Sequence, residues 1–150
     1  MIKKKIETAY RKLIKYDSYL LTNSANERSI THKLGEYLKE EFLEYDVDCE
    51  YNLNGLDPKK ISSFKKNIES DNTDAVSVYP DIIIHKRGTT ENFIVIEAKK
   101  SSNKNKDDNE KLSNYKNDLG YKHAFFIIFP VAEQFNLKFK LDNLIEEIKP

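Results

Sequence analysis

Charged residues at the ends of two short apolar runs are the part of this sequence best suited to chemistry. Asp81 opens the first run, and Glu97 and Lys99 close the second. A short segment containing Gly88 joins the runs, which is typical of two neighbouring strands of one sheet. Adjacent strands would bring the carboxylates of Asp81 and Glu97 together, and such groups repel each other unless a cation lies between them. The pair therefore predicts a divalent metal site.

The motif at 97–99 is distinguished by its position in the sequence more than by its residue types. The pattern of an acidic residue, any residue and lysine occurs three times, at 57–59, 97–99 and 147–149. Only the middle copy follows four apolar residues of strand type and comes one strand after a Pro-Asp pair. A strand period of two places Glu97 and Lys99 on one face and Ala98 on the other. The Ala98 carbonyl would be a further metal ligand if the strand frays there. A salt bridge at a strand end is the simpler explanation, although it leaves Asp81 unexplained.

Glu27 is the next candidate, on a helix that is expected to begin near Ser24. The segment 24–27 fits a capping box, in which Glu27 would bond to the helix backbone. Glu27 also lies three residues before Ile30 and shares the apolar helix face, where its carboxylate would reach the metal site. Both interpretations stay open. Glu36 lies off this face and is expected to point to solvent.

The histidines and the single cysteine have weaker contexts. His32 falls off the apolar helix face and His85 ends a strand, so both are expected at the surface. His123 precedes a buried strand and has no partner that the sequence identifies. A single cysteine, Cys49, excludes an internal disulfide or a zinc cluster built of cysteines. No Ser-His-Asp arrangement or Gly-rich phosphate loop is present.

Composition bounds the class of protein. The 150 residues are 39% hydrophobic and 33% charged, which predicts one globular domain spanning 1–150. No window approaches ~18 consecutive apolar residues, and no apolar segment follows the N-terminal lysines, so a cytoplasmic protein is expected. The 25 basic residues balance the 25 acidic ones, so net charge does not favour nucleic acid. The group Lys99–Lys106 is either solvated surface or a phosphate-attracting patch.

The hydrophobic pattern predicts a mixed sheet flanked by helices. On the helix after the motif strand, Lys111 and Tyr115 share one side, and packing explains Tyr115 better than contact with substrate. Gly120 is a suitable C-terminal cap for this helix. The expected helices cover 2–21, 24–42, 59–69, 112–119 and 144–148, and the expected strands cover 47–51, 76–85, 93–99, 124–129 and 135–141.

Over about residues 24–130 the chain resembles the PD-(D/E)XK nuclease superfamily, which has the restriction-endonuclease-like fold. The resemblance lies in Pro80-Asp81, in Glu97-Ala98-Lys99, and in an upstream helix bearing Glu27. It is greatest toward small stand-alone members, which also carry a Lys-Leu and a Tyr like Lys111-Leu112 and Tyr115 on the helix after the motif strand. The implied fold is α/β with the order αβββαβ.

This resemblance implies a Mg²⁺- or Mn²⁺-dependent endodeoxyribonuclease. By that resemblance Asp81, Glu97 and the Ala98 carbonyl bind the metal. Lys99 would orient the attacking water or neutralise the transition state, and Glu27 would hold a metal-bound water or a second ion. DNA is the expected partner, and a homodimer is expected only by analogy. A non-catalytic nucleic-acid-binding or assembly module on the same fold is the alternative.

Overall fold

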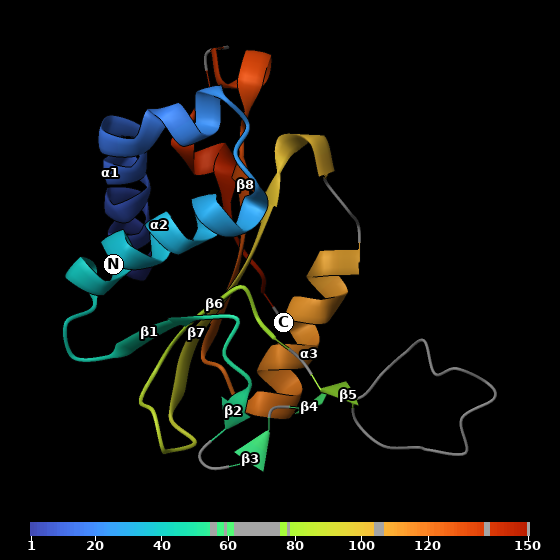
Figure 1. Ribbon diagram of the computed structural model, residues 1–150. Coiled ribbons are helices and arrows are strands. Elements are labelled where there is room, and N and C mark those ends of the chain that lie inside the picture. Colours follow the sequence, from blue (N-terminus) through green and yellow to red (C-terminus); the bar gives the residue numbers. More distant parts are fainter. Residues whose placement is uncertain are drawn as a thin grey trace.

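A five-stranded mixed sheet forms the centre of the protein, with helices on both of its faces (Figure 1). The computed structural model describes residues 1–54, 57–58, 60–61, 76–77, 79–103, 107–136 and 139–149. Strands β6 and β7 form an antiparallel pair, and β7 and β8 run parallel. The α/β class with a mixed sheet is therefore as predicted. In spatial order the strands are β1 (Asp46–Cys49), β6 (Ile82–His85), β7 (Asn92–Lys100), β8 (His123–Phe129) and β9 (Ile145–Glu147).

In the described part of the chain, three α-helices cover the sheet. Helices α1 (Ile2–Thr22) and α2 (Glu27–Glu41) lie on one face, and α3 (Asp107–Leu119) lies on the other (Figure 1). Helix α3 ends at Gly120, whose φ of 69° is the left-handed conformation that glycine adopts without steric cost. Among the described helices, none combines the length and the apolar character needed to cross a bilayer.

Strand β7 separates two hydrophobic cores because its side chains alternate between the two faces of the sheet. Ile94, Ile96 and Ala98 join the core beneath α1 and α2. Val95 joins the smaller core beneath α3, which also contains Tyr115. Burial of each large apolar side chain contributes roughly 1.5–3 kcal/mol, which makes the register of β7 costly to change.

The same register determines where the charged residues lie. Ile82 pairs with Ile96 and Ile83 pairs with Val95, so the next antiparallel position places Asp81 opposite Glu97. Asp81 immediately precedes β6, and Pro80 before it has no N–H to donate to a sheet. The strand expected over 76–85 is accordingly two strands, β5 (Val76–Ser77) and β6.

The start of α2 differs from the capping box that the sequence suggested. The cap residue is Asn26, whose side chain accepts a hydrogen bond from the Ser29 backbone N–H at 2.8 Å. Asparagine caps a helix as well as serine does, and Ser24 instead has a positive φ of 49° in the turn after α1. Glu27 is consequently the first helical residue and does not act as the reciprocal cap.

Two regions have a different secondary structure from the one predicted. Residues 57–58 and 60–61 belong to short strands, so the helix expected over 59–69 does not begin there, and its remaining residues lie outside the described part of the chain. Residues 145–147 form β9 and pair with β8, where a closing helix was expected. The strand expected over 135–141 is wrong as well, because η2 (Ala132–Asn136) and η3 (Leu141–Leu144) are short 3₁₀ turns. The other short elements are β2 (Leu53–Asn54), β3 (Asp57–Pro58), β4 (Lys60–Ile61) and η1 (Ser101–Asn103).

Candidate functional site

The predicted meeting of Asp81 and Glu97 is present in the structure. Glu97 is only 1% exposed on β7, beside the start of β6. Asp81 Oδ2 accepts a hydrogen bond from the Ala98 backbone N–H at 2.9 Å, which fixes its carboxyl group against β7. The Glu50 backbone N–H donates to the Asp81 carbonyl at 3.2 Å and ties the same residue to the end of β1. Asp81 is thus held by the two strands beside it.

Glu97 is in an environment that opposes its charge. Burial and the nearby negative charge of Asp81 raise the pKa of Glu97 well above its ordinary value, despite the opposing influence of Lys111 and Tyr115. A hydrogen bond between the side chains of Asp81 and Glu97 contributes to this rise. Two carboxyl groups can share a hydrogen bond only when one of them carries a proton. The pair therefore takes up a proton or a cation.

Helix α3 supplies two further contacts to this pair. The Tyr115 hydroxyl donates to Glu97 Oε1 at 3.1 Å, and Lys111 Nζ lies 3.4 Å from the same oxygen. Burial and the carboxylate of Glu97 together raise the pKa of the Tyr115 hydroxyl, which stays a donor. These two residues were expected to share one helix side, with Tyr115 in a packing role. Their spacing of four residues was the signal that two polar groups reach one target.

Lys99 and Glu27 form a second part of the site. Lys99 Nζ lies 3.8 Å from Glu27 Oε1, so the ion pair of the motif lysine is with Glu27 and not with Glu97. Glu27 Oε2 also accepts the Lys100 backbone N–H at 3.3 Å. Both contacts bring the start of α2 against the end of β7. Glu27 therefore reaches this region, as one of its two interpretations required, although it contacts the lysine and the strand backbone instead of the carboxyl pair.

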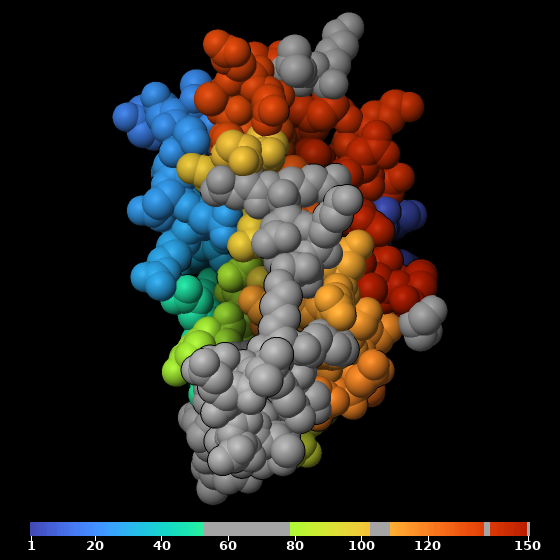
Figure 2. All heavy atoms as spheres, turned by 90° about the vertical axis from the view of Figure 1, so that its right-hand side faces the viewer, coloured from blue at the N-terminus to red at the C-terminus, as the bar shows by residue number. Residues whose placement is uncertain are grey.

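The end of β7 remains an ordered strand. Lys100 still pairs with Phe129 of β8, so the fraying that would free the Ala98 carbonyl is not seen on that side. Lys100 Nζ lies 3.4 Å from the Ser24 carbonyl oxygen and 3.3 Å from that of Ala25. In Figure 2 the yellow surface near residue 100 adjoins the blue surface of α2. Lys104 and Lys106 of the expected phosphate-attracting group lie outside the described residues.

An open cleft lies beside Asp81, between the start of α2 and the end of β1. Its volume is about 640 Å³. Arg28 and Glu50 form an ion pair of 3.1 Å among its walls, and both side chains are largely exposed. Glu50 has a φ of 51°, which is an uncommon backbone conformation for a residue other than glycine. The lining residues are Asn26, Glu27, Arg28, Thr31, His32, Cys49, Glu50 and Asp81.

Cys49 in this cleft is not suited to nucleophilic chemistry. The residue is exposed, but its sulfur lies 4.0 Å from the Thr31 carbonyl oxygen and close to Gly35, where an added Cβ would lie 3.0 Å from it. Burial of the thiol and the charges of Asp48, Asp81 and Glu50 raise its pKa to about 11. A thiol with that pKa is protonated at neutral pH.

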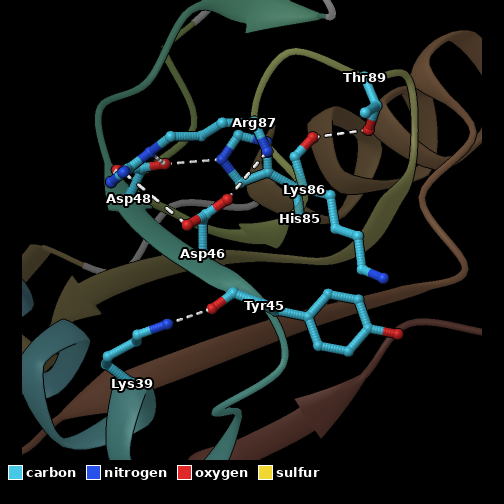
Figure 3. A network of polar contacts seen from close by, with 8 residues as sticks. All are labelled: Lys39, Tyr45, Asp46, Asp48, His85, Lys86, Arg87 and Thr89. Atoms are coloured by element: carbon cyan, nitrogen blue, oxygen red, sulfur yellow. Dashed lines mark hydrogen bonds and ion pairs between the residues drawn. The ribbon is translucent and has the colours of Figure 1, made fainter.

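A second polar cluster occupies the other end of β6 (Figure 3). His85 was expected at the surface, but it is 2% exposed, and its Nε2 lies 2.7 Å from Asp48 Oδ2. Arg87 approaches both oxygens of Asp48, and its Nε lies 2.9 Å from Oδ2. The Arg87 backbone N–H donates to Asp46 at 3.0 Å. Because β1 pairs with β6, these contacts form between residues far apart in the sequence.

The other two histidines pair with glutamates. His32 is exposed, as predicted, and contacts Glu36 one turn further along α2 at 3.0 Å. The sequence identified no partner for His123, and in the structure its Nδ1 lies 3.0 Å from Glu147 Oε2. The physical reason is the strand β9, which brings Glu147 alongside β8. Neither histidine contacts Asp81 or Glu97.

The donor set at the carboxyl pair fits a hard divalent cation in part. Within the described residues, no group of three or more histidine, cysteine, aspartate or glutamate side chains is arranged to hold a metal ion. Asp81 and Glu97 supply two carboxyl groups that are already forced together. Magnesium commonly binds through one or two carboxylates and retains several water molecules, so a pair of this kind meets its requirement.

Comparisons with models of protein families, with curated proteins and with solved structures found no match to this chain. Its function must therefore be argued from the site itself.

Proposed function

We propose that this protein is a metal-dependent nuclease of the PD-(D/E)XK type, which hydrolyses phosphodiester bonds in DNA. The observation that carries the proposal is the contact between Asp81 and the buried Glu97 at the ends of two adjacent strands. A protein that only needed an ion pair there would not bury one acid against a second. Functional sites are where such mutually repelling groups are retained, since the repulsion is relieved when a ligand binds.

The proposed site assigns a role to each residue. Asp81 and Glu97 would hold Mg²⁺ or Mn²⁺, with the Ala98 carbonyl as a further oxygen ligand. When bound, the ion would acidify an attacking water and stabilise the charge that develops on the scissile phosphate. Lys99 would present its ammonium to the water or the phosphate, and Glu27 at 3.8 Å holds that ammonium in place.

The arrangement of elements also supports the proposal. A helix that bears Glu27, three strands and a helix with a following strand succeed one another as α2, β1, β6, β7, α3 and β8. This order is the one expected of a restriction-endonuclease-like αβββαβ core, with the proposed metal-binding acids just before its second strand and near the end of its third. The short strands β2 to β5 lie in the connection between β1 and β6.

The experiment combines metal binding with DNA cleavage. Wild-type protein is titrated with Mn²⁺ by calorimetry and then incubated with supercoiled plasmid and either Mn²⁺ or Mg²⁺. We expect binding, and nicking that requires the metal. Glu97→Ala should lose both, whereas Lys99→Ala should bind Mn²⁺ and lose cleavage. Glu133→Ala is the matched control, because Glu133 is an exposed acid on η2. Absence of Mn²⁺ binding by the wild type would reject the proposal.

One observation favours a second candidate function. Lys111 and Tyr115 already contact Glu97, and Lys99 is paired with Glu27. A site whose charges are partnered in this way also suits a non-catalytic nucleic-acid-binding module. DNA binding that persists without Mn²⁺, with no cleavage in its presence, would select this second function.

A further inference from the structure

We propose that Lys111 is a built-in counter-ion of the Asp81–Glu97 pair, which a divalent cation displaces when it binds. Lys111 is then a positioning residue that keeps the carboxyl groups together in the metal-free protein. This inference rests on the proposed function, because it concerns the same pair of acids. The counter-ion comes from α3, outside the Glu-x-Lys motif.

Three lysines near the pair have different partners. Lys99 is directed to Glu27, and Lys100 Nζ lies near the carbonyl oxygens of residues 24 and 25. Lys111 instead lies 3.4 Å from Glu97 Oε1, and it comes from the opposite face of the sheet to α2. Of these three lysines, it is the one whose ammonium neutralises the buried acid.

A counter-ion is needed at this position because Glu97 is buried beside another acid. Charge that is removed from water without a partner is strongly destabilising. The Tyr115 hydroxyl at 3.1 Å supplies a hydrogen bond to Glu97 but no charge. Lys111 supplies the charge, and its ammonium also lies 5.9 Å from the centre of the Tyr115 ring, within range of a cation–π contact.

The contact of Lys111 is suited to exchange. Its side chain is 41% exposed, so the ammonium can move into water at little cost. The distance of 3.4 Å is longer than the roughly 2.7–2.9 Å of a strong charge-assisted hydrogen bond. Tyr115, by contrast, is fully buried and remains in place. Both α3 contacts fall on Oε1 of Glu97, which leaves Oε2 free of α3 for an incoming ion.

Displacement predicts competition between the ammonium and the metal. Removing the charge of Lys111 should therefore strengthen metal binding, whereas loss of a purely structural contact would weaken it or leave it unchanged. The Mn²⁺ dissociation constant of Lys111→Met should fall by at least about tenfold, the scale on which a unit charge ~5 Å away acts on a divalent ion even at the dielectric constant of water. Calorimetric titration of the full chain at low salt measures it.

Three variants control this measurement. Lys111→Arg keeps the positive charge and should bind Mn²⁺ no more tightly than the wild type does. Lys116→Met removes a lysine from the same helix, where it contacts the Ile148 carbonyl oxygen at 3.5 Å, and should also leave the affinity unchanged. Lys111→Gln replaces the methionine variant if that protein does not fold. The metal-free methionine variant should melt at a lower temperature than the wild type. Excess Mn²⁺ should raise the melting temperature of this variant by more than it raises that of the wild type.

The outcomes separate this inference from the proposed function. Tighter Mn²⁺ binding by Lys111→Met than by the wild type supports the counter-ion role. If the wild type binds Mn²⁺ and Lys111→Met binds it with equal or weaker affinity, the counter-ion role is overturned and the metal site is retained. Failure of both proteins to bind Mn²⁺ rejects the metal site, and the inference with it.

Discussion

The two ends of strand β6 each carry a polar cluster that contains an acid shielded from solvent. The pKa of that acid is shifted in opposite directions in the two clusters. At the end near His85, burial of Asp48 is outweighed by hydrogen bonds from Arg87 and His85, and its pKa is lowered. At the end near Asp81, burial and a second acid raise the pKa of Glu97. The first cluster is a closed network in which a guanidinium grips both oxygens of one carboxylate. The second cluster contains the pair Asp81–Glu97, and its cation, Lys111, makes one contact of 3.4 Å.

From this difference we expect Asp48 to stabilise the fold and Glu97 to be available for a ligand. The planar fork of arginine matches a carboxylate and leaves little to be gained by exchanging it for another cation. The single ammonium of Lys111 makes one long contact, so a divalent ion gains more there. The expectation for Glu97 therefore depends on the geometry of its cationic partner as well as on its burial.

The largest expected effect concerns Glu97. Glu97→Gln keeps the shape of the side chain and removes its charge, so we expect plasmid cleavage to fall by at least ~10²-fold. The same change removes repulsion with Asp81 and should leave the free energy of unfolding at pH 8 unchanged or higher. Cleavage assays and urea unfolding test the two parts. If Glu97→Gln is active, or if it is unfolded, the distinction between a ligand-binding acid at Glu97 and a stabilising acid at Asp48 is wrong.

Asp48 should show the reverse behaviour. Asp48→Ala removes a shared partner of the buried His85 and the half-exposed Arg87, and loss of hydrogen bonds to a charged group costs about 1.5–3 kcal/mol. We expect this loss of unfolding free energy without a change in Mn²⁺ affinity. Urea unfolding and calorimetry measure the two quantities. Weaker Mn²⁺ binding in a folded Asp48→Ala would show that the clusters are coupled.

The dependence of stability on pH should differ in sign between the two acids. The pKa of Glu97 is raised above 4.5 in the folded state, so its contribution is present at low pH and is lost as the pH rises above that value. The pKa of Asp48 is lowered below 3.8, so its contribution is present above that value and is lost as the pH falls below it. Unfolding free energies of metal-free protein from pH 3 to 9 should therefore decline at both ends.

Two variants test which acid causes each decline in unfolding free energy. Glu97→Gln should flatten the decline on the alkaline side, and Asp48→Asn should flatten the decline on the acidic side. An alkaline decline that persists in Glu97→Gln would mean that the carboxyl pair is not its source.

The smallest expected effect concerns Tyr115. Tyr115→Phe removes one hydrogen bond to the buried Glu97 and should cost about 1–2 kcal/mol of unfolding free energy. Lys111 remains, so Mn²⁺ affinity should change by less than about threefold. Thermal unfolding and calorimetry measure both quantities. Tyr121→Phe is a suitable control, because the hydroxyl of this buried tyrosine has no hydrogen-bond partner within the described structure. A loss in Tyr115→Phe no larger than in this control would exclude a contribution from the hydrogen bond.

Local patterns were sufficient wherever neighbouring residues decided the structure. Helix α1, strands β7 and β8, and the end of α3 at Gly120 follow from periodicity and from one glycine. The approach of Asp81 to Glu97 was also predictable, because a short connection between two strands leaves few registers that keep the isoleucines buried. The nuclease function inferred from this pair stays a prediction.

Other features depended on partners that are distant in the sequence. The burial of His85 needs Asp48 on β1, and the strand at 145–147 exists because β8 offers it an edge. The predicted capping box was wrong for a local reason, since Ser24 and Asn26 are both good caps and the turn after α1 selected Asn26.

The sequence by itself determined which acids meet, since strand alternation and a short connection act over a few residues. Only the tertiary structure decided which cations face those acids. Lys99 is one strand position removed from Ala98, yet its ammonium pairs with Glu27, while Lys111 reaches Glu97 from a helix on the other face. A long, flexible side chain takes its partner from the packing of whole elements, and that packing is set by the burial of apolar surface far from the charge.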